Sequence, residues 1–285
     1  MQTETHSKTR IDVVADDFGM HSAVDEAIVL LASRGRLSGT GCLVDGPSFA
    51  DGAGSLLSSG LQCGLHLNFT ESFGARGVFM PLGELLRACW GRRLDPARIQ
   101  RQIASQLDRY EAVMGQAPQY VDGHQHVHQF PQIREMLFAE LERRYPAGLP
   151  RPWLRSTLAG RQTGVPVGLR FKAHSIAALG GRRHVRLACR HGFETNRRLL
   201  GVYDFRGGAQ TYEGLLQCWL EGARAGDLIM CHPAVQSVPG DPLGAQRQAE
   251  FEVWASDATG ALLERLGVQI SRPEGCRPRV PMPAA

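Results

Sequence analysis

Short apolar segments alternate with amphipathic segments along most of this 285-residue chain. Continuous apolar runs indicate strands that are buried on both faces, whereas apolar residues at steps of three and four indicate helices that cover a sheet. The alternation therefore predicts parallel βα units. The strand-like runs are 11–15, 39–44, 62–67, 119–122, 153–156, 227–231 and 268–271. Seven or eight mostly parallel strands, each followed by a helix, favour an α/β fold of the (β/α) barrel type over an open sheet.

Capping residues predict where two of the helices begin. Ser22, with Asp25 three residues later, forms a capping-box pattern before an apolar helical face. Asp95 precedes Pro96 at the start of a longer periodic segment, and Gly115 is placed to end it. Near the other end of the chain, residues 246–266 are expected to form one helix.

The pattern predicts a single domain over residues 1–271. Periodicity is poor around 157–208, where we expect an irregular insertion with one helix near 182–191. Residues 272–285 contain four prolines and are expected to form a flexible tail.

The charge and cysteine content argue against several classes of protein. With 32 Lys and Arg against 28 Asp and Glu, the chain is only mildly basic. Its densest basic cluster, at 182–190, is interpreted as a solvated helix face that can steer an anionic substrate, and no nucleic-acid partner is expected. The seven cysteines form no C-x-x-C pair, which favours reduced thiols and a cytoplasmic location. No apolar run approaches the roughly 20 residues that span a bilayer, so no transmembrane segment is expected.

Acidic and imidazole side chains occur where four of the predicted strands end. Asp16 and Asp17 follow the first run, His66 lies near the end of the third, 122–128 follows the fourth, and His232 follows the run at 227–231. The carboxyl ends of parallel strands meet on one face of a barrel, where catalytic residues collect. Oxygen and nitrogen ligands together bind divalent cations, so the sequence predicts a metal-dependent enzyme.

Each of these residues also has a structural interpretation. Asp16 and Asp17 can cap the following helix, although Ser22 is available for that purpose. A single buried histidine such as His66 is usually a hydrogen-bonded core residue. Because an unperturbed imidazole titrates near neutrality, His232 is expected to be able to act as a general acid or base. The functional interpretation is favoured because the candidates share one setting, the end of a strand.

The segment 122–128 is the strongest local signal. In an extended chain, alternating histidines place their imidazoles on one face, and Gly123 is expected to permit an unusual backbone angle. From the residues alone, one or two of the three histidines are expected to bind metal, and the others to position substrate or to support the ligands.

These motifs resemble those of the YdjC-like carbohydrate deacetylases, a family that includes chitooligosaccharide deacetylases and hopanoid-associated deacetylases. The resemblance covers most of the chain, and four ordered motifs are more specific than any one of them. The matching residues are 15–19, 64–67, 122–128 with Phe130 and Pro131, and 230–234. Gly123 departs from the family pattern, in which serine is common at this position.

The resemblance implies a deformed, TIM-like (β/α) barrel that removes the acetyl group from an N-acetylated amino sugar and releases acetate. It implies one divalent metal ion held by Asp17, His66 and His124. It further implies Asp16 as the catalytic base and His232 as a candidate acid. Both Mg²⁺ and Zn²⁺ are compatible with this mixed set of ligands.

The remaining candidates are assigned to substrate binding. His126 and His128 follow the metal histidine, and Arg155 lies at a predicted strand end. The loop 69–81 is a further candidate for substrate contacts. The expected partner is an N-acetylated saccharide or glycolipid, with a homodimer as a possible assembly. Two alternatives are a metal-dependent amidohydrolase acting on another small amide and a catalytically silent sugar-binding barrel. A glycoside hydrolase is less favoured, because that chemistry requires two opposed carboxylates.

Overall fold

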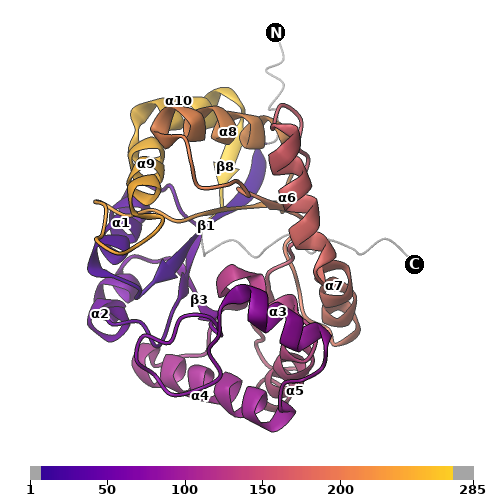
Figure 1. Ribbon diagram of the computed structural model, residues 1–285. Helices are drawn as coiled ribbons and strands as arrows, with labels where there is room; N and C mark the ends of the chain where they lie inside the picture. Colours follow the sequence, from indigo (N-terminus) through magenta and orange to yellow (C-terminus); the bar gives the residue numbers. More distant parts are fainter. Residues whose placement is uncertain (1–7, 272–285) are drawn as a thin grey trace.

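The computed structural model describes residues 8–271, and the proposed tail at 272–285 lies outside them (Figure 1). Within this range eight strands, all paired in parallel, form one curled sheet with the order β5-β4-β3-β2-β1-β7-β6, and β8 pairs with β1. The predicted deformed barrel of seven or eight mostly parallel strands is confirmed. The strands are β1 (Thr9–Phe18), β2 (Gly39–Cys42), β3 (Gln62–Leu67), β4 (Tyr120–Gly123), β5 (Trp153–Leu154), β6 (Leu199–Leu200), β7 (Leu228–Cys231) and β8 (Val268–Ile270).

Strand β1 is the centre of the sheet. It pairs with β2 on one side, and on the other side its first residues pair with β8 and its next residues with β7. Within the described residues, the two ends of the curled sheet are joined by two isolated bridges, Leu154 with Thr195 and Ala159 with Leu199. The barrel is therefore closed by short, irregular contacts between β5 and β6 and the segments around them.

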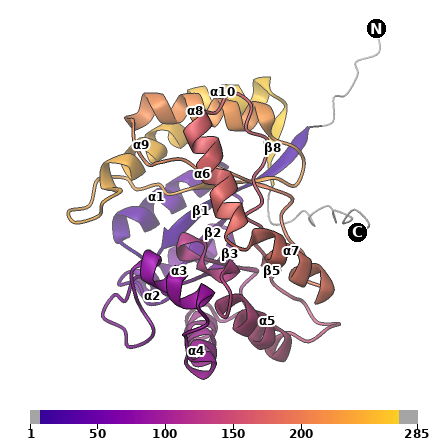
Figure 2. The same cartoon turned by 45° about the vertical axis from the view of Figure 1, so that its right-hand side comes forward.

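Helices surround the sheet in both ribbon views (Figures 1 and 2). None of the described helices is long and apolar enough to cross a membrane. The helices are α1 (Ser22–Ser33), α2 (Phe49–Ser58), α3 (Leu82–Trp90), α4 (Pro96–Met114), the 3₁₀ helix η1 (His124–Gln129), α5 (Ile133–Arg144), α6 (Val167–Ala178), α7 (Gly181–Arg190), α8 (Gly208–Gly222), α9 (Gly244–Ala255) and α10 (Asp257–Arg265).

The predicted boundaries of α4 are confirmed, because Asp95 accepts a hydrogen bond from the Ala97 amide and Gly115 ends the helix at φ 66°. Helix α1 is capped one residue earlier than predicted. The Nδ1 atom of His21 accepts from the Ala23 amide, and Ser22 is already helical. The single helix predicted at 246–266 is also wrong: the backbone of Ser256 is extended, so α9 and α10 are separate.

The segment 157–208 is more regular than predicted. It contains α6 and α7, which pack against each other, and the two-residue strand β6. Helix α6 was missed because its large apolar residues do not all face the protein: Val167 and Phe171 are among the most exposed apolar side chains of the described chain.

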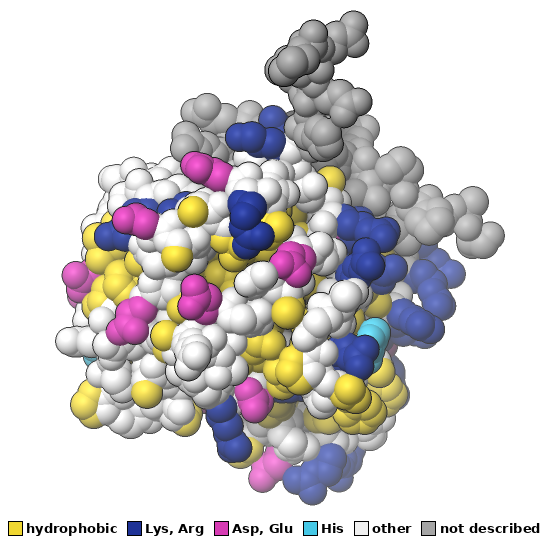
Figure 3. Space-filling model, turned by 90° about the horizontal axis from the view of Figure 1, so that it is seen from above, with side chains coloured by type: hydrophobic (Ala, Val, Ile, Leu, Met, Phe, Trp, Pro, Cys, Tyr) yellow, Lys and Arg dark blue, Asp and Glu magenta, His cyan; other side chains and the backbone are white. Residues whose placement is uncertain are grey.

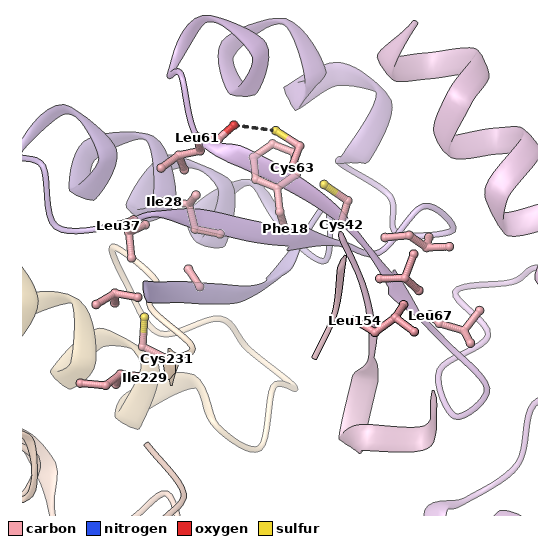
Figure 4. Packing of buried hydrophobic residues seen from close by; sticks show 14 of the residues in the cluster. Phe18, Ile28, Leu37, Cys42, Leu61, Cys63, Leu67, Leu154, Ile229 and Cys231 are labelled. Carbon is pink, nitrogen blue, oxygen red and sulfur yellow. Dashed lines mark hydrogen bonds between the residues drawn. The ribbon is translucent and has the colours of Figure 1, made fainter. Parts of the chain in front are cut away.

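The apolar runs are buried on both faces of the sheet, as the sequence predicts. Every residue of β1 from Ile11 to Phe18 is buried. Figure 4 shows side chains from several strands, among them Cys42, Leu67 and Ile229, packed in one hydrophobic cluster. Such packing holds the strands rigidly, so polar side chains at their carboxyl ends are held in fixed positions.

Candidate functional site

Asp16 and Asp17 lie in an irregular part of β1. The pairing of β1 with β2 shifts register between Ala15 and Phe18, and Asp17 has a left-handed backbone with φ 72°. In a regular strand two successive side chains would point to opposite faces, whereas an extra residue at a bulge redirects one of them. Here both carboxylates face buried cationic and imidazole groups at the mouth of the barrel.

Two imidazoles from different elements, His66 and His124, lie close to one carboxylate oxygen of Asp17. Its Oδ1 atom lies 2.9 Å from Nδ1 of His124 and 3.5 Å from Nε2 of His66. One ligand atom from each of these residues lies within 4.8 Å of the others, and all three side chains are buried. The structure therefore brings together the three residues that the sequence comparison implied as metal ligands.

The imidazole of His66 is oriented by a neighbouring strand. Its Nδ1 atom lies 2.6 Å from Oδ1 of Asp122 on β4, which leaves Nε2 directed at Asp17. Burial alone would lower the pKa of His66, but the carboxylates of Asp122 and Asp16 raise it to about 10. Gly41 on β2 makes room for the ring, since a Cβ atom there would lie 3.0 Å from Nδ1. Asp122 belongs to the histidine motif, yet sequence analysis gave it no role.

Arg155 bridges two carboxylates. Its guanidinium donates to both oxygens of Asp16, at 2.6 and 2.7 Å, and lies 2.6 Å from Oδ2 of Asp122. Burial would raise the pKa of Asp16, but Arg155 and His66 hold it below its usual value. Arg155 was expected to contact substrate. Its side chain has no exposed surface, so it is assigned instead to holding these carboxylates.

A second buried arginine holds Asp17. Arg247 on α9 donates from Nη2 to Oδ2 of Asp17 at 2.7 Å and from Nε to Asp241 at 2.8 Å. Burial would raise the pKa of Asp17, but Arg247 and His124 lower it well below its usual value. Sequence analysis missed Arg247, because one arginine in an amphipathic helix carries no local sign of a buried partner.

His232 approaches the centre from β7. Its Nε2 atom lies 3.7 Å from Oδ2 of Asp16, and its ring meets the ring of Phe205 edge-on. Its backbone amide donates to Glu250, a buried residue of α9 that also accepts from the hydroxyl of Tyr203. Burial lowers the pKa of His232 to about 4, so the imidazole is neutral at pH 7. Glu250 was missed for the same reason as Arg247.

The sequence analysis expected an extended histidine segment, and this prediction is wrong. β4 ends at Gly123, whose φ of −162° is ordinary extended backbone, and the left-handed angles occur at Gln125 and His126. In this chain Gly123 instead allows a close approach of the backbone, because a Cβ atom there would lie 2.9 Å from the backbone nitrogen of His128. The turn places the three imidazoles in separate environments.

His126 and His128 differ in what they can contact. His128 is fully buried, donates from Nε2 to the backbone carbonyl of Arg155 at 3.0 Å, and meets His184 of α7 edge-on. It therefore offers no surface to a substrate. His126 is partly exposed, and its Nδ1 atom has no hydrogen-bond partner within residues 8–271.

The donor set fits a divalent cation. One carboxylate oxygen and two imidazole nitrogens converge, and Asp122 holds the His66 ring in place, as carboxylates commonly do for histidines that bind a metal. The carboxylates of Asp17 and Asp122, which lie close to the two ring nitrogens of His66, favour positive charge at this point and raise the pKa of His66. A hollow of about 590 Å³ lined by Arg151, Trp153 and Arg190 lies at the start of β5. This is the end of the sheet opposite to the carboxyl ends of the strands, so the hollow has no part in the candidate centre.

Comparison with known proteins identifies a family and two groups of relatives with related sequences. A family model described as YdjC-like protein matches residues 10–265. A carbohydrate deacetylase from Homo sapiens is 27% identical over 92% of this chain and 90% of its own length. A chitooligosaccharide deacetylase from Yersinia pestis is 31% identical, over 45% of this chain and 53% of its own length.

Two solved structures share the fold. A protein from Enterococcus faecalis, described as a candidate for cellobiose-phosphate cleavage, matches with a TM-score of 0.67 and 19% identity, over 93% of this chain and 98% of its own. A peptidoglycan N-acetylglucosamine deacetylase matches with a TM-score of 0.50 and 11% identity, over 93% and 86% of the two chains. At these identities the likeness shows the architecture alone.

Proposed function

We propose that this chain, which belongs to the YdjC-like family, is a metal-dependent carbohydrate N-deacetylase. The observation that carries the proposal is the convergence of Asp17, His66 and His124 beside Asp16 and His232. The names of the human and Yersinia relatives support the reaction class. The proposed substrate is an oligosaccharide or glycolipid that contains N-acetylglucosamine, and the products are acetate and the free amino sugar.

Asp17, His66 and His124 would hold one divalent ion, either Mg²⁺ or Zn²⁺. When bound, such an ion acidifies water and polarises the acetyl carbonyl. The protein arranges its own charges for this purpose. Asp122 fixes the His66 ring, and Arg247 occupies Oδ2 of Asp17, so that Oδ1 remains directed at the two histidines.

Asp16 and His232 are the groups that would move protons. Water adds to the acetyl carbon and loses a proton, and the C–N bond breaks as the amine nitrogen gains one. At pH 7 Asp16 is a carboxylate, because Arg155 and His66 lower its pKa, and His232 is a neutral imidazole with a pKa of about 4, so each can accept a proton. Asp16 would accept the proton from water. His232, the more basic of the two, would carry it to the amine.

His126 is the best-placed of the three proposed substrate-binding residues. Its imidazole is partly exposed, so the accessible part of the ring would contact the sugar, although its Nδ1 atom is itself buried. The buried contacts of Arg155 and His128 assign those two residues to the support of the site.

The test is acetate release from N-acetylglucosamine oligosaccharides by the full chain, with Mg²⁺ or Zn²⁺ added and after chelation. Wild-type protein should release acetate only with metal. Asp17→Asn and His124→Ala should each lower the rate by about a thousandfold or more, because each removes a ligand of the ion that activates the water.

His174→Ala is the matched control, since this histidine is exposed on α6 and should be replaceable without loss of activity. Circular dichroism establishes that the variants are folded. Absence of acetate release from every N-acetylated sugar and glycolipid offered, with either metal, would refute the deacetylase. Full activity in Asp17→Asn would refute the site.

A further inference from the structure

The α6–α7 segment differs in charge from the rest of the molecule. Residues 156–193 include seven Lys and Arg and no Asp or Glu. Because the whole chain has 32 Lys and Arg against 28 Asp and Glu, the remaining residues carry three more acids than bases. The positive net charge of the protein therefore comes from this one segment.

Helix α7 presents its arginines on the solvent side. Arg182, Arg186 and Arg190 recur every four residues and are exposed together with Arg183, whereas Val185 is buried against the protein. Within residues 8–271, no carboxylate forms an ion pair with Arg182, Arg183 or Arg186. Figure 3 shows Lys and Arg side chains gathered on the right of the molecule, the side on which Figure 1 places α6 and α7.

Large apolar side chains are exposed on α6, the helix that precedes α7, and on α3. Phe171 and Val167, one turn apart on α6, are 75% and 70% exposed. Leu82 and Trp90, at the two ends of α3, are exposed as well. Four of the seven exposed large apolar residues of the described chain thus lie on two helices. The full set is Leu30, Leu57, Leu82, Trp90, Leu149, Val167 and Phe171.

Both helices are attached to the rim of the candidate site. Gln129, at the end of η1, donates to the backbone carbonyl of Ile176 in α6. Gln132, three residues later, exchanges two hydrogen bonds with the backbone of Leu94 just after α3. Figures 1 and 2 show α3 and α6 on the near side of the barrel. Helices α3 and α6 therefore lie on the side of the barrel that carries η1 and the candidate site.

We propose that α6 and α7, together with α3, form a surface that docks the mouth of the barrel onto an anionic lipid bilayer. Arginines bind acidic headgroups, and the apolar side chains at the helix surface enter the boundary with the acyl chains. The phosphates of a nucleic acid would bind the arginines, but a nucleic acid has no apolar environment in which an aliphatic residue such as Val167 could be buried. Neutral sugars give no reason for a segment with seven cations and no acid. The proposal does not depend on deacetylation.

The test is cosedimentation of the full chain with vesicles of phosphatidylcholine, with or without about one third phosphatidylglycerol, and at low and high salt. Binding should require the anionic lipid and should weaken with salt. Each arginine near an anionic surface raises partitioning about fivefold, so Arg182→Ser, Arg183→Ser and Arg186→Ser combined should lower it about a hundredfold. Phe171→Ser should lower it about tenfold.

The matched control combines Arg98→Ser, Arg101→Ser and Arg265→Ser, three exposed arginines on α4 and α10 that change the net charge equally. This control should bind vesicles nearly as wild type does. An equal loss in the control would overturn the proposal, as would binding to pure phosphatidylcholine or to neither kind of vesicle. Salt-sensitive binding to a double-stranded DNA fragment without vesicle binding would replace the bilayer by a nucleic acid.

Discussion

Arginine side chains occupy two opposite settings in this molecule. At the strand ends, Arg155 and Arg247 are almost fully buried, and each contacts two carboxylates. On α7, Arg182 and Arg186 are exposed, and no carboxylate is present in the surrounding segment 156–193. A buried charge must be compensated, whereas an exposed one is solvated by water. Arg155 and Arg247 therefore fix the carboxylates inside the site, whereas Arg182 and Arg186 give the surface of α7 a positive electrostatic potential.

The largest expected difference between the two settings is in stability. Arg155→Met removes the cation shared by Asp16 and Asp122 and should lower the free energy of unfolding by about 3–5 kcal/mol. Arg182→Met, the exposed counterpart, should change it by about 0.5 kcal/mol or less. Urea unfolding at pH 7 measures both. Similar effects of the two substitutions would remove the distinction between buried and exposed arginines.

A second prediction concerns the buried carboxyl group of Glu250. Burial raises its pKa to about 7, above that of an exposed glutamate. The protonated form is thus favoured by folding, so the contribution of Glu250 to stability is greatest below about pH 4.5 and is lost as the pH rises to about 7. Relative to Glu250→Gln, wild-type protein should lose up to about 3 kcal/mol over that interval.

Urea unfolding at a series of pH values between 4 and 8 measures this loss. Glu252→Gln, an exposed glutamate on the same helix, is the control and should follow the wild-type curve. If wild type and Glu250→Gln show the same pH dependence, Glu250 does not titrate in this range, and the predicted effect of burial on its pKa is wrong.

The smallest of the expected effects is at Asp122. Asp122→Asn keeps the shape of the side chain but removes the charge that orients His66, and metal affinity should fall about ten- to a hundredfold. Calorimetric titration with Zn²⁺ or Mg²⁺ measures this without turnover. Asp51→Asn, at an exposed position of α2, should leave affinity unchanged. An unaltered affinity in Asp122→Asn would show that His66 is held by packing alone.

The strand ends could be predicted from sequence because each carries its own signal. A continuous apolar run followed by an acid or imidazole identifies β1, β3, β4 and β7 without knowledge of their neighbours. The order of these strands in the sheet then brings Asp17, His66 and His124 together.

Features that depend on distant contacts could not be predicted. Arg247 and Glu250 lie one turn apart on α9, and only the packing of that helix directs them to Asp17 and to the backbone of His232. The turn in η1 was missed because Gln125 and His126, neither of them glycine, adopt left-handed angles that tertiary contacts must impose.

The close approach of His66 to the backbone of Gly41 sets a condition for transplanting this constellation. A designer who copies the acids and imidazoles onto another scaffold must also place a glycine on the adjoining strand, at the position that faces the imidazole as Gly41 faces His66. Even an alanine methyl would lie 3.0 Å from the imidazole and displace it by a few tenths of an ångström. Such a shift is enough to move the ring nitrogen out of the position that a metal ligand requires.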